Sequence, residues 1–158
     1  MTIRLATEED SEEIVLLLNE TTVDLHQKGI MQWEYPWDKQ MILNRITHSF
    51  IYVLEQDRQV IGTFYLTSQT VLNSSSLEGT SKYLGQIALK PAFQGQQLGS
   101  KMIKFALDLA NQEKATLYLD CWAGNKKLKA FYTSVGMHYV GDFPHNGYNV
   151  SQFHSLPR

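Results

Sequence analysis

The most informative segment of the sequence is LGQIALKPAFQGQQLGS, residues 84–100. The residues before Pro91 predict a strand, Tyr83–Leu89, because they are mostly apolar and the proline ends the run. Gly85 inside this strand indicates a bulge or a close backbone approach. A glycine-containing turn follows, residues 94–100, and leads into a helix with an apolar stripe. The residues of this stripe are Leu98, Met102, Phe105 and Leu109.

This turn is a candidate phosphate site. The first turn of a helix has free N–H groups and about half a positive charge, so it attracts an anion without needing many lysines. Gly95 and Gly99 allow a ligand to approach the backbone closely. The spacing fits neither a Walker A loop, since only three residues separate these glycines, nor the Gly-x-Gly-x-x-Gly fingerprint of dinucleotide-binding folds. Spacing alone therefore leaves two interpretations open, a phosphate site and a purely structural helix start.

The rest of the chain predicts helices and strands in alternation. A first helix is predicted between Thr7 and Gly29, and a short second helix after Asp38. A last helix is predicted over Asn125–Val135, and the Ser-rich residues 73–81 predict a surface loop. Further strands are predicted at residues 51–55, 60–66, 115–121, 138–140 and 148–153. This order indicates an α+β fold on a mixed sheet.

Two motifs in register resemble those of one enzyme family. Residues 84–100 resemble the acetyl-coenzyme A motif of the GNAT N-acetyltransferases. Downstream, NKKLKAFYTSVGM, residues 125–137, is similar to the second motif of that family, an Asn followed by a Phe-Tyr pair and a Gly. The motifs have the family's order and separation, and two motifs in register arise by chance much less often than one.

The resemblance implies one GNAT-like α+β domain over residues 1–158. Its sheet would be mixed and mostly antiparallel, with six to seven strands, about four flanking helices, and a bulged, splayed central strand marked by Gly85. The implied activity is transfer of an acetyl group from acetyl-coenzyme A, used as co-substrate, to an amine by direct attack in a ternary complex. A homodimer is one implied state, because dimerisation is common in the family.

The resemblance also implies which residues bind the co-substrate. The strand before the turn would hold the pantetheine arm through its main chain, and the amides of the turn would hold the pyrophosphate. Lys127, with Lys126 and Lys129, would supply positive charge for the remaining phosphate; a solvated helix face is the equal alternative. The implied binding residues are Ile87, Ala88, Leu89, Gln94, Gly95, Gln96, Gln97, Leu98, Gly99, Ser100, Asn125 and Lys127.

Gln97 departs from the family's pattern, Gln/Arg-x-x-Gly-x-Gly/Ala, because it stands in place of the middle glycine. If that position requires a positive φ, glutamine costs about 1–2 kcal/mol there. The backbone N–H survives, so we expect a weaker fit rather than a lost one. The departure keeps two other functions open: a non-catalytic acyl-coenzyme A sensor on the same fold, and a phosphate site for an unrelated ligand such as a nucleotide.

Tyr132 is the implied catalytic residue, because a tyrosine at this motif position acts in the family as general acid beside the thioester sulfur. Full proton transfer to the thiolate is uphill by roughly 2 kcal/mol, since tyrosine has a pKa of about 10 and a thiol about 8.5. A hydrogen bond that strengthens as charge develops on sulfur would still help. The structural alternative is a tyrosine that only packs in the core beside Leu128 and Phe131.

The general base is not assigned by the sequence. Many family members place a carboxylate on the bulged strand, but residues 83–86 contain none. Glu34, Asp120 and His26 are the remaining candidates, acting directly or through water. The aromatic residues 33–37 lie where the family builds its acceptor pocket, and ordinary aromatic packing is the alternative. The acceptor stays open among small-molecule amines, antibiotics, peptide N-termini and protein lysines.

Composition bounds the class of protein. With 158 residues and 43% hydrophobic residues the chain suits a single domain with a sizeable core. A formal net charge of −2 gives no broad basic surface for nucleic acid or an anionic membrane. The first ten residues contain no apolar segment of the kind found in signal peptides or membrane spans, so we expect a cytoplasmic protein. Five histidines without ligand spacing and a single cysteine, Cys121, predict no metal site and a buried, inert thiol.

Overall fold

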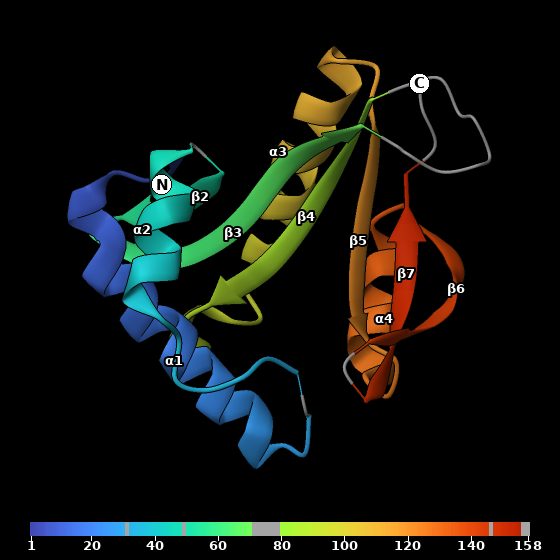
Figure 1. Ribbon diagram of the computed structural model, residues 1–158, viewed down its shortest axis with the longest axis horizontal. Coiled ribbons are helices and arrows are strands. Elements are labelled where there is room, and N and C mark those ends of the chain that lie inside the picture. Colours follow the sequence, from blue (N-terminus) through green and yellow to red (C-terminus); the bar gives the residue numbers. More distant parts are fainter. Residues whose placement is uncertain (31, 49, 71–79, 146, 156–158) are drawn as a thin grey trace. The chain divides into compact units, whose positions relative to one another are not determined.

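The computed structural model describes residues 1–30, 32–48, 50–70, 80–145 and 147–155. Seven strands form one sheet in the order β1-β2-β3-β4-β5-β7-β6, and only the pair β4–β5 is parallel (Figure 1). The elements are β1 (Thr2–Leu5), η1 (Glu8–Asp10), α1 (Ser11–Gln27), α2 (Lys39–Thr47), β2 (Ile51–Gln56), β3 (Gln59–Thr70), β4 (Thr80–Leu89), η2 (Pro91–Phe93), α3 (Leu98–Gln112), β5 (Thr116–Trp122), α4 (Lys126–Ser134), β6 (His138–His145) and β7 (Tyr148–His154). The predicted fold, α+β on a mixed and mostly antiparallel sheet, is confirmed.

The chain divides into two compact units. The first contains Met1–Leu66 and Gln86–Met102, and the second contains Thr67–Gly85 and Ile103–Arg158. The division falls within β3 after Leu66, within β4 after Gly85 and within α3 after Met102.

In the first unit, helices α1 and α2 pack on strands β2 and β3 (Figure 1). Arg4 of β1 fixes the start of α1, because its guanidinium binds Asp10 at 2.8 Å and also Glu55 of β2 at 2.8 Å. This hydrogen bond from Arg4 is the main cause that lowers the pKa of Asp10. The core shared by these elements consists of Ala6, Ile14, Leu17, Leu18, Ile42, Ile46, Ile51, Val53, Val60 and Ala88.

The predicted end of the first helix and the predicted start of the second are observed, whereas α1 begins only at Ser11, after the 3-10 turn η1 that follows Thr7. Gly29, at φ +77°, follows the C-cap of α1, and the Asp38 side chain caps α2 by accepting a hydrogen bond from the Gln40 amide at 3.0 Å. The hairpin β2–β3 turns at Asp57 and Arg58, both with positive φ, as in a two-residue type I′ turn. Strand β1 was not predicted, since four residues carry too short a pattern.

Strand β4 begins earlier than predicted. Most of the predicted loop 73–81 lies outside the described residues, but Thr80 and Ser81 belong to β4, and Ser81 pairs with Thr116 of β5. The polar residues there are held in the strand by Lys82, whose buried ammonium group contacts Glu113 at 2.8 Å and Ser68 at 2.9 Å. Propensity alone could not reveal these contacts.

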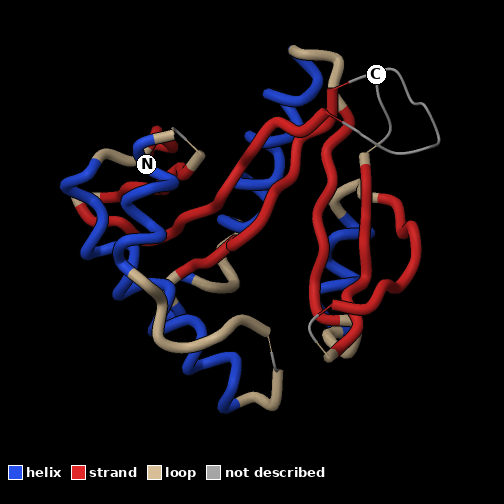
Figure 2. Tube along the Cα trace, viewed as in Figure 1, coloured by secondary structure: helices blue, strands red, loops and turns tan. Residues whose placement is uncertain are grey.

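In the second unit, β5, β7 and β6 lie side by side and α4 packs beside β6 (Figure 2). The burial of β5 alternates strictly: Leu117, Leu119 and Cys121 are buried, and the residues between them are half-buried. Strand β6 runs to His145 rather than ending at residue 140 as predicted, because it pairs along its whole length with β7. In β5, the alternation of buried residues places Tyr118, Asp120 and Trp122 on the face of the sheet opposite to Leu117, Leu119 and Cys121.

Candidate active site

The predicted phosphate turn is exposed and open in the first unit. After η2, residues 94–97 are exposed, and α3 begins at Leu98. Gly95 has φ +82°, and a Cβ built on it would meet no atom within 4 Å. In the described part of the chain, the amides of residues 95–100 donate to no carbonyl or side chain. These amides are therefore available to an anion.

Gln97 has the left-handed backbone that the sequence argument anticipated. Its φ is +64°, and its carbonyl accepts the first hydrogen bond of α3, from Lys101 N at 3.4 Å. The position thus requires the conformation that glycine adopts without strain, and glutamine costs about 1–2 kcal/mol there. The amide itself is kept.

The strand segment that leads to the turn is pinned to β3. Lys90 N donates to Ile61 O at 2.8 Å, and Gly62 packs closely against the strand, since a Cβ on it would lie 3.2 Å from Ala88 O. The Gln94 side chain donates to Leu89 O at 3.2 Å and ties the turn back to the strand. Ile87 and Leu89 are half-buried, whereas Ala88 is buried. The predicted residues 87–89 and 94–100 are therefore part of one continuous segment of the first unit.

Gly85 allows a close contact with the Tyr83 ring, and the β4 residue with a positive φ is its neighbour Gln86. Gln86 has φ +51°, while Gly85 has no positive φ. A Cβ on Gly85 would lie 2.8 Å from the Tyr83 ring, so the ring can lie across this residue only because it is glycine. Of the two sequence interpretations of Gly85, a bulge or a close approach, the contact with the Tyr83 ring supports the close approach.

Tyr132 lies in the core of the second unit. It is 3% exposed, and its ring packs edge-on against Phe153 at 5.5 Å between centroids. Burial raises the pKa of Tyr132 well above its ordinary value, with further contributions from Cys121, Asp120 and Tyr83. Among the described residues its hydroxyl has no hydrogen-bond partner. The phenol is thus held protonated and uncommitted to another protein group.

The other predicted residues of the second motif differ in their burial and contacts. Asn125 is buried and caps α4, since its Oδ1 accepts from Leu128 N at 3.1 Å. Lys127 and Lys126 are exposed. Lys129 instead donates to Ala123 O at 3.3 Å and lies over the Tyr139 ring.

Asp120 is a carboxylate on the half-buried face of β5. It accepts a hydrogen bond from the Tyr83 hydroxyl at 3.0 Å. Burial raises the pKa of Asp120, against the opposing effects of this hydrogen bond and of His145. Cys121 next to it is inert as expected, because burial raises the pKa of its thiol to about 12.

The link between Tyr83 and Asp120 was missed by the sequence argument. Tyr83 pairs with Tyr118 across the parallel strands, so Asp120, two residues further, lies on the same face. The signal for it is the alternation of buried residues in β5.

The two other candidate bases, His26 and Glu34, lie in the first unit. His26 Nε2 contacts the carbonyls of Gln32 and Trp33 at 3.2 and 3.0 Å, so this nitrogen is a donor that fixes the loop after α1. Glu34 is exposed.

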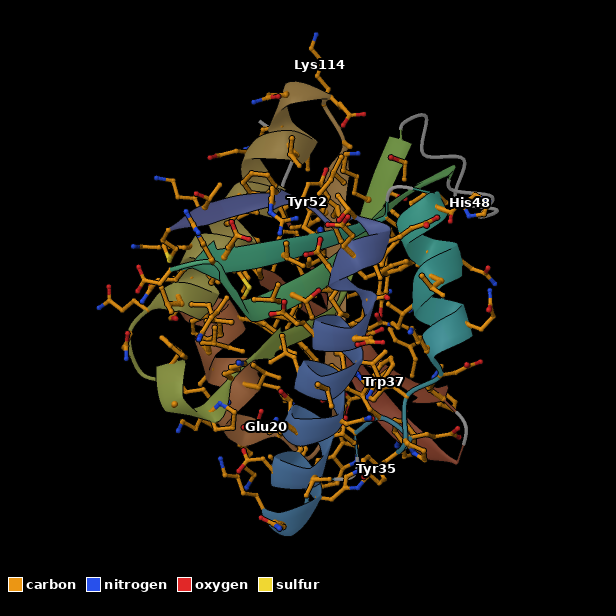
Figure 3. All side chains as sticks on the ribbon, turned by 90° about the vertical axis from the view of Figure 1, so that its left-hand side faces the viewer. Glu20, Tyr35, Trp37, His48, Tyr52 and Lys114 are labelled. Atoms are coloured by element: carbon orange, nitrogen blue, oxygen red, sulfur yellow. The ribbon has the colours of Figure 1, made fainter. Side chains whose placement is uncertain are left out.

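The aromatic segment 33–37 is mostly anchored by packing. Trp37 lies beside α1 (Figure 3), and its indole donates to Thr22 at 2.9 Å while Trp33 packs edge-on against it. Tyr35 is exposed and lines a groove of about 610 Å³ along α1. Packing therefore accounts for both tryptophans.

The fold and these motifs define an acyltransferase, and the comparisons with known proteins agree. A model of the acetyltransferase (GNAT) family matches residues 11–137, and the chain belongs to this family. It is similar to the uncharacterized N-acetyltransferase YesJ of Bacillus subtilis (strain 168), at 28% identity over 86% of this chain and 81% of the relative. It is also similar to an S-alkylcysteine N-acetyltransferase of the same organism, at 30% identity over 65% of this chain and 56% of the relative.

Solved structures show the same fold. An acetyltransferase of the GNAT family from Streptococcus agalactiae 2603 matches with a TM-score of 0.83 at 19% identity, over 99% of this chain and 95% of the other. The structure of yncA from Salmonella typhimurium with its cofactor acetyl-CoA matches with a TM-score of 0.76 at 18% identity, over 99% and 93%. None of the helices in the described ranges has the length and apolar character that crossing a bilayer requires. Those ranges also contain no group of three or more His, Cys, Asp or Glu residues that could hold a metal ion.

Proposed function

We propose that the protein transfers the acetyl group of acetyl-coenzyme A to the α-amine of a small acceptor, by direct attack in a ternary complex. The observation that carries the proposal is the turn 94–100, which is exposed at residues 94–97 and leads into α3, and in which the amides of residues 95–100 have no protein partner among the described residues. These amides would bind the pyrophosphate, and the main chain of residues 87–89 would bind the pantetheine arm. Asn125 and Lys127 of the second motif would also bind the co-substrate.

Tyr132 is proposed to assist the departure of the thiolate. Because its pKa is raised, its hydroxyl keeps the proton at neutral pH and full transfer to sulfur is less favourable than for an ordinary tyrosine. We therefore assign it a hydrogen bond to sulfur that strengthens as negative charge develops. The free hydroxyl and the buried, low-dielectric surroundings support this role.

An α-amine is the acceptor class with the lowest cost of losing a proton. At pH 7 an amine of pKa about 8 requires about 1 kcal/mol, whereas a lysine-like amine of pKa about 10.4 requires roughly 4–5 kcal/mol. The name of one relative, an S-alkylcysteine N-acetyltransferase, supports the same class.

The first test is calorimetric titration of acetyl-coenzyme A into the protein, with ATP as control. Saturable 1:1 binding that ATP does not compete away supports the site despite Gln97. No binding at millimolar concentration would contradict it, and competition by ATP would favour a nucleotide ligand.

The second test is turnover with a panel of amines: S-methylcysteine, Nα-acetyl-lysine and spermidine. Coenzyme A release is followed with a thiol reagent, and the buried Cys121, with its pKa raised to about 12, adds little background. We expect S-methylcysteine to react fastest. Binding of acetyl-coenzyme A without turnover on any amine would favour the sensor function instead.

A further inference from the structure

We infer that Asp120 is the general base for the acceptor amine and that Tyr83, lying across Gly85, positions it. The inference rests on the proposed function and deepens it. Strand β4 carries no carboxylate at its bulge, and here the adjacent strand β5 supplies one, reached by a tyrosine from β4.

The contacts of Asp120 leave one oxygen open. Tyr83 Oη donates to Oδ1 at 3.0 Å, and in the described part of the chain Oδ2 accepts from no group. No lysine or arginine of that part forms an ion pair with this carboxylate. A half-buried carboxylate with one hydrogen bond and no lysine or arginine partner contributes little to stability, which is typical of a residue kept for chemistry.

Tyr83 holds Asp120 through the geometry of Gly85. Any side chain at residue 85 would collide with the Tyr83 ring, since even a Cβ would lie 2.8 Å from it. The ring is thereby free to lie along the sheet and reach Asp120 on the neighbouring strand. The hydroxyl fixes one carboxylate oxygen and leaves the other for the substrate.

The groups that face Asp120 suit a base. Tyr83 comes from β4 and His145 from β6, and the partner of Asp120 on β7 is the neutral Gln152. Tyr132 of α4 and Cys121 of β5 lie toward the buried face and interact with Asp120 only electrostatically. Burial raises the pKa of Asp120, which strengthens it as a proton acceptor, and the hydrogen bond from Tyr83 opposes this rise.

The ammonium form of the acceptor loses one proton to Asp120 Oδ2, and the amine nitrogen attacks the thioester carbonyl carbon. The N–C bond forms, the C–S bond breaks, and sulfur leaves as thiolate beside the Tyr132 hydroxyl. The amine's second proton protonates the thiolate, and Asp120 returns its proton to solvent.

The test compares Asp120→Asn with wild type for S-methylcysteine acetylation between pH 5.5 and 9.5. General-base catalysis contributes about 10²–10⁴-fold, so we expect kcat at pH 6.5 to fall by at least about 100-fold. The loss should shrink as pH rises, because more of the amine is already deprotonated. Binding of acetyl-coenzyme A, measured by calorimetry, should change less than about threefold.

Tyr83→Phe tests the positioning role through the pH profile. Removing its hydrogen bond raises the pKa of Asp120 further, so the acid limb of kcat/KM should move to higher pH while the rate at high pH is nearly kept. A structural role would lower the rate equally at all pH values. Asp120→Glu should recover part of the activity, which separates a base from a packing requirement.

A matched control exists on β6. Asp142 also accepts a hydrogen bond from a tyrosine, Tyr139 at 2.8 Å, but it is exposed, and hydrogen bonds, first that from Ser151, lower its pKa. We expect Asp142→Asn and Tyr139→Phe to keep kcat within about twofold. Turnover unchanged in Asp120→Asn, or lost equally in Asp142→Asn, would overturn the inference alone. Binding of acetyl-coenzyme A without turnover on any amine would overturn the proposed function and the inference together.

Discussion

Replacing Gln97 by glycine should stabilise the protein. The residue has φ +64°, a conformation that costs an L-amino acid about 1–2 kcal/mol. Its exposed side chain makes no hydrogen bond within the described residues, so removing it loses no contact. Glycine gives back about 0.5–1 kcal/mol through the greater freedom of the unfolded chain. From the middle of the two ranges, the expected net gain is about 0.75 kcal/mol.

For a chain of 158 residues this gain corresponds to a rise in Tm of about 1–4 °C. The assay is thermal and urea unfolding of Gln97→Gly beside Gln96→Gly. Gln96 is equally exposed and has no positive φ, so its replacement should destabilise by about 0.5–1 kcal/mol. If the two variants shift Tm in the same direction, the strain at Gln97 is not real and the reasoning fails.

Three other predictions concern single side chains. Tyr132→Phe should lower kcat by about 10²-fold or more with acetyl-coenzyme A affinity nearly intact; kinetics with calorimetry check this, and an unchanged kcat removes Tyr132 from the mechanism. Asn125→Ala should cost about 1 kcal/mol of unfolding free energy by uncapping α4, whereas Asn125→Asp should keep the cap yet weaken acetyl-coenzyme A binding if its Nδ2 is a ligand. The Arg4 hydrogen bond lowers the pKa of Asp10, so its contribution to stability is present above the unfolded pKa of about 3.9 and is lost as pH falls through the folded value. Urea unfolding of Asp10→Asn should therefore show a deficit at pH 7 that shrinks as the pH falls below about 3.9.

Local signals were sufficient for most of the fold. The Asp38 cap and the glycine after α1 fixed both helix boundaries, because each depends on residues close in sequence. Strand β4 was cut short in the prediction because Ser81 and Lys82 are polar, and only contacts with β5 and Glu113 keep them in the sheet. Such contacts join residues more than thirty positions apart, which no pattern within a window records.

In the candidate site too, local sequence patterns predict some residues, whereas others depend on contacts between distant parts of the chain. The turn 94–100 and Tyr132 could be found because each belongs to a contiguous motif, and the strain at Gln97 followed from one substitution within it. The pair Tyr83–Asp120 depends on the register of two parallel strands, which the sequence does not state. Once Tyr83 is placed opposite Tyr118, period-two alternation puts Asp120 on the face of Tyr83 and Cys121 on the buried face. The register of β4 and β5 therefore places the Asp120 carboxylate where it can accept a proton and buries the Cys121 thiol, which keeps its proton. Strand pairing, rather than a sequence motif, determines which side chain of β5 is available for chemistry.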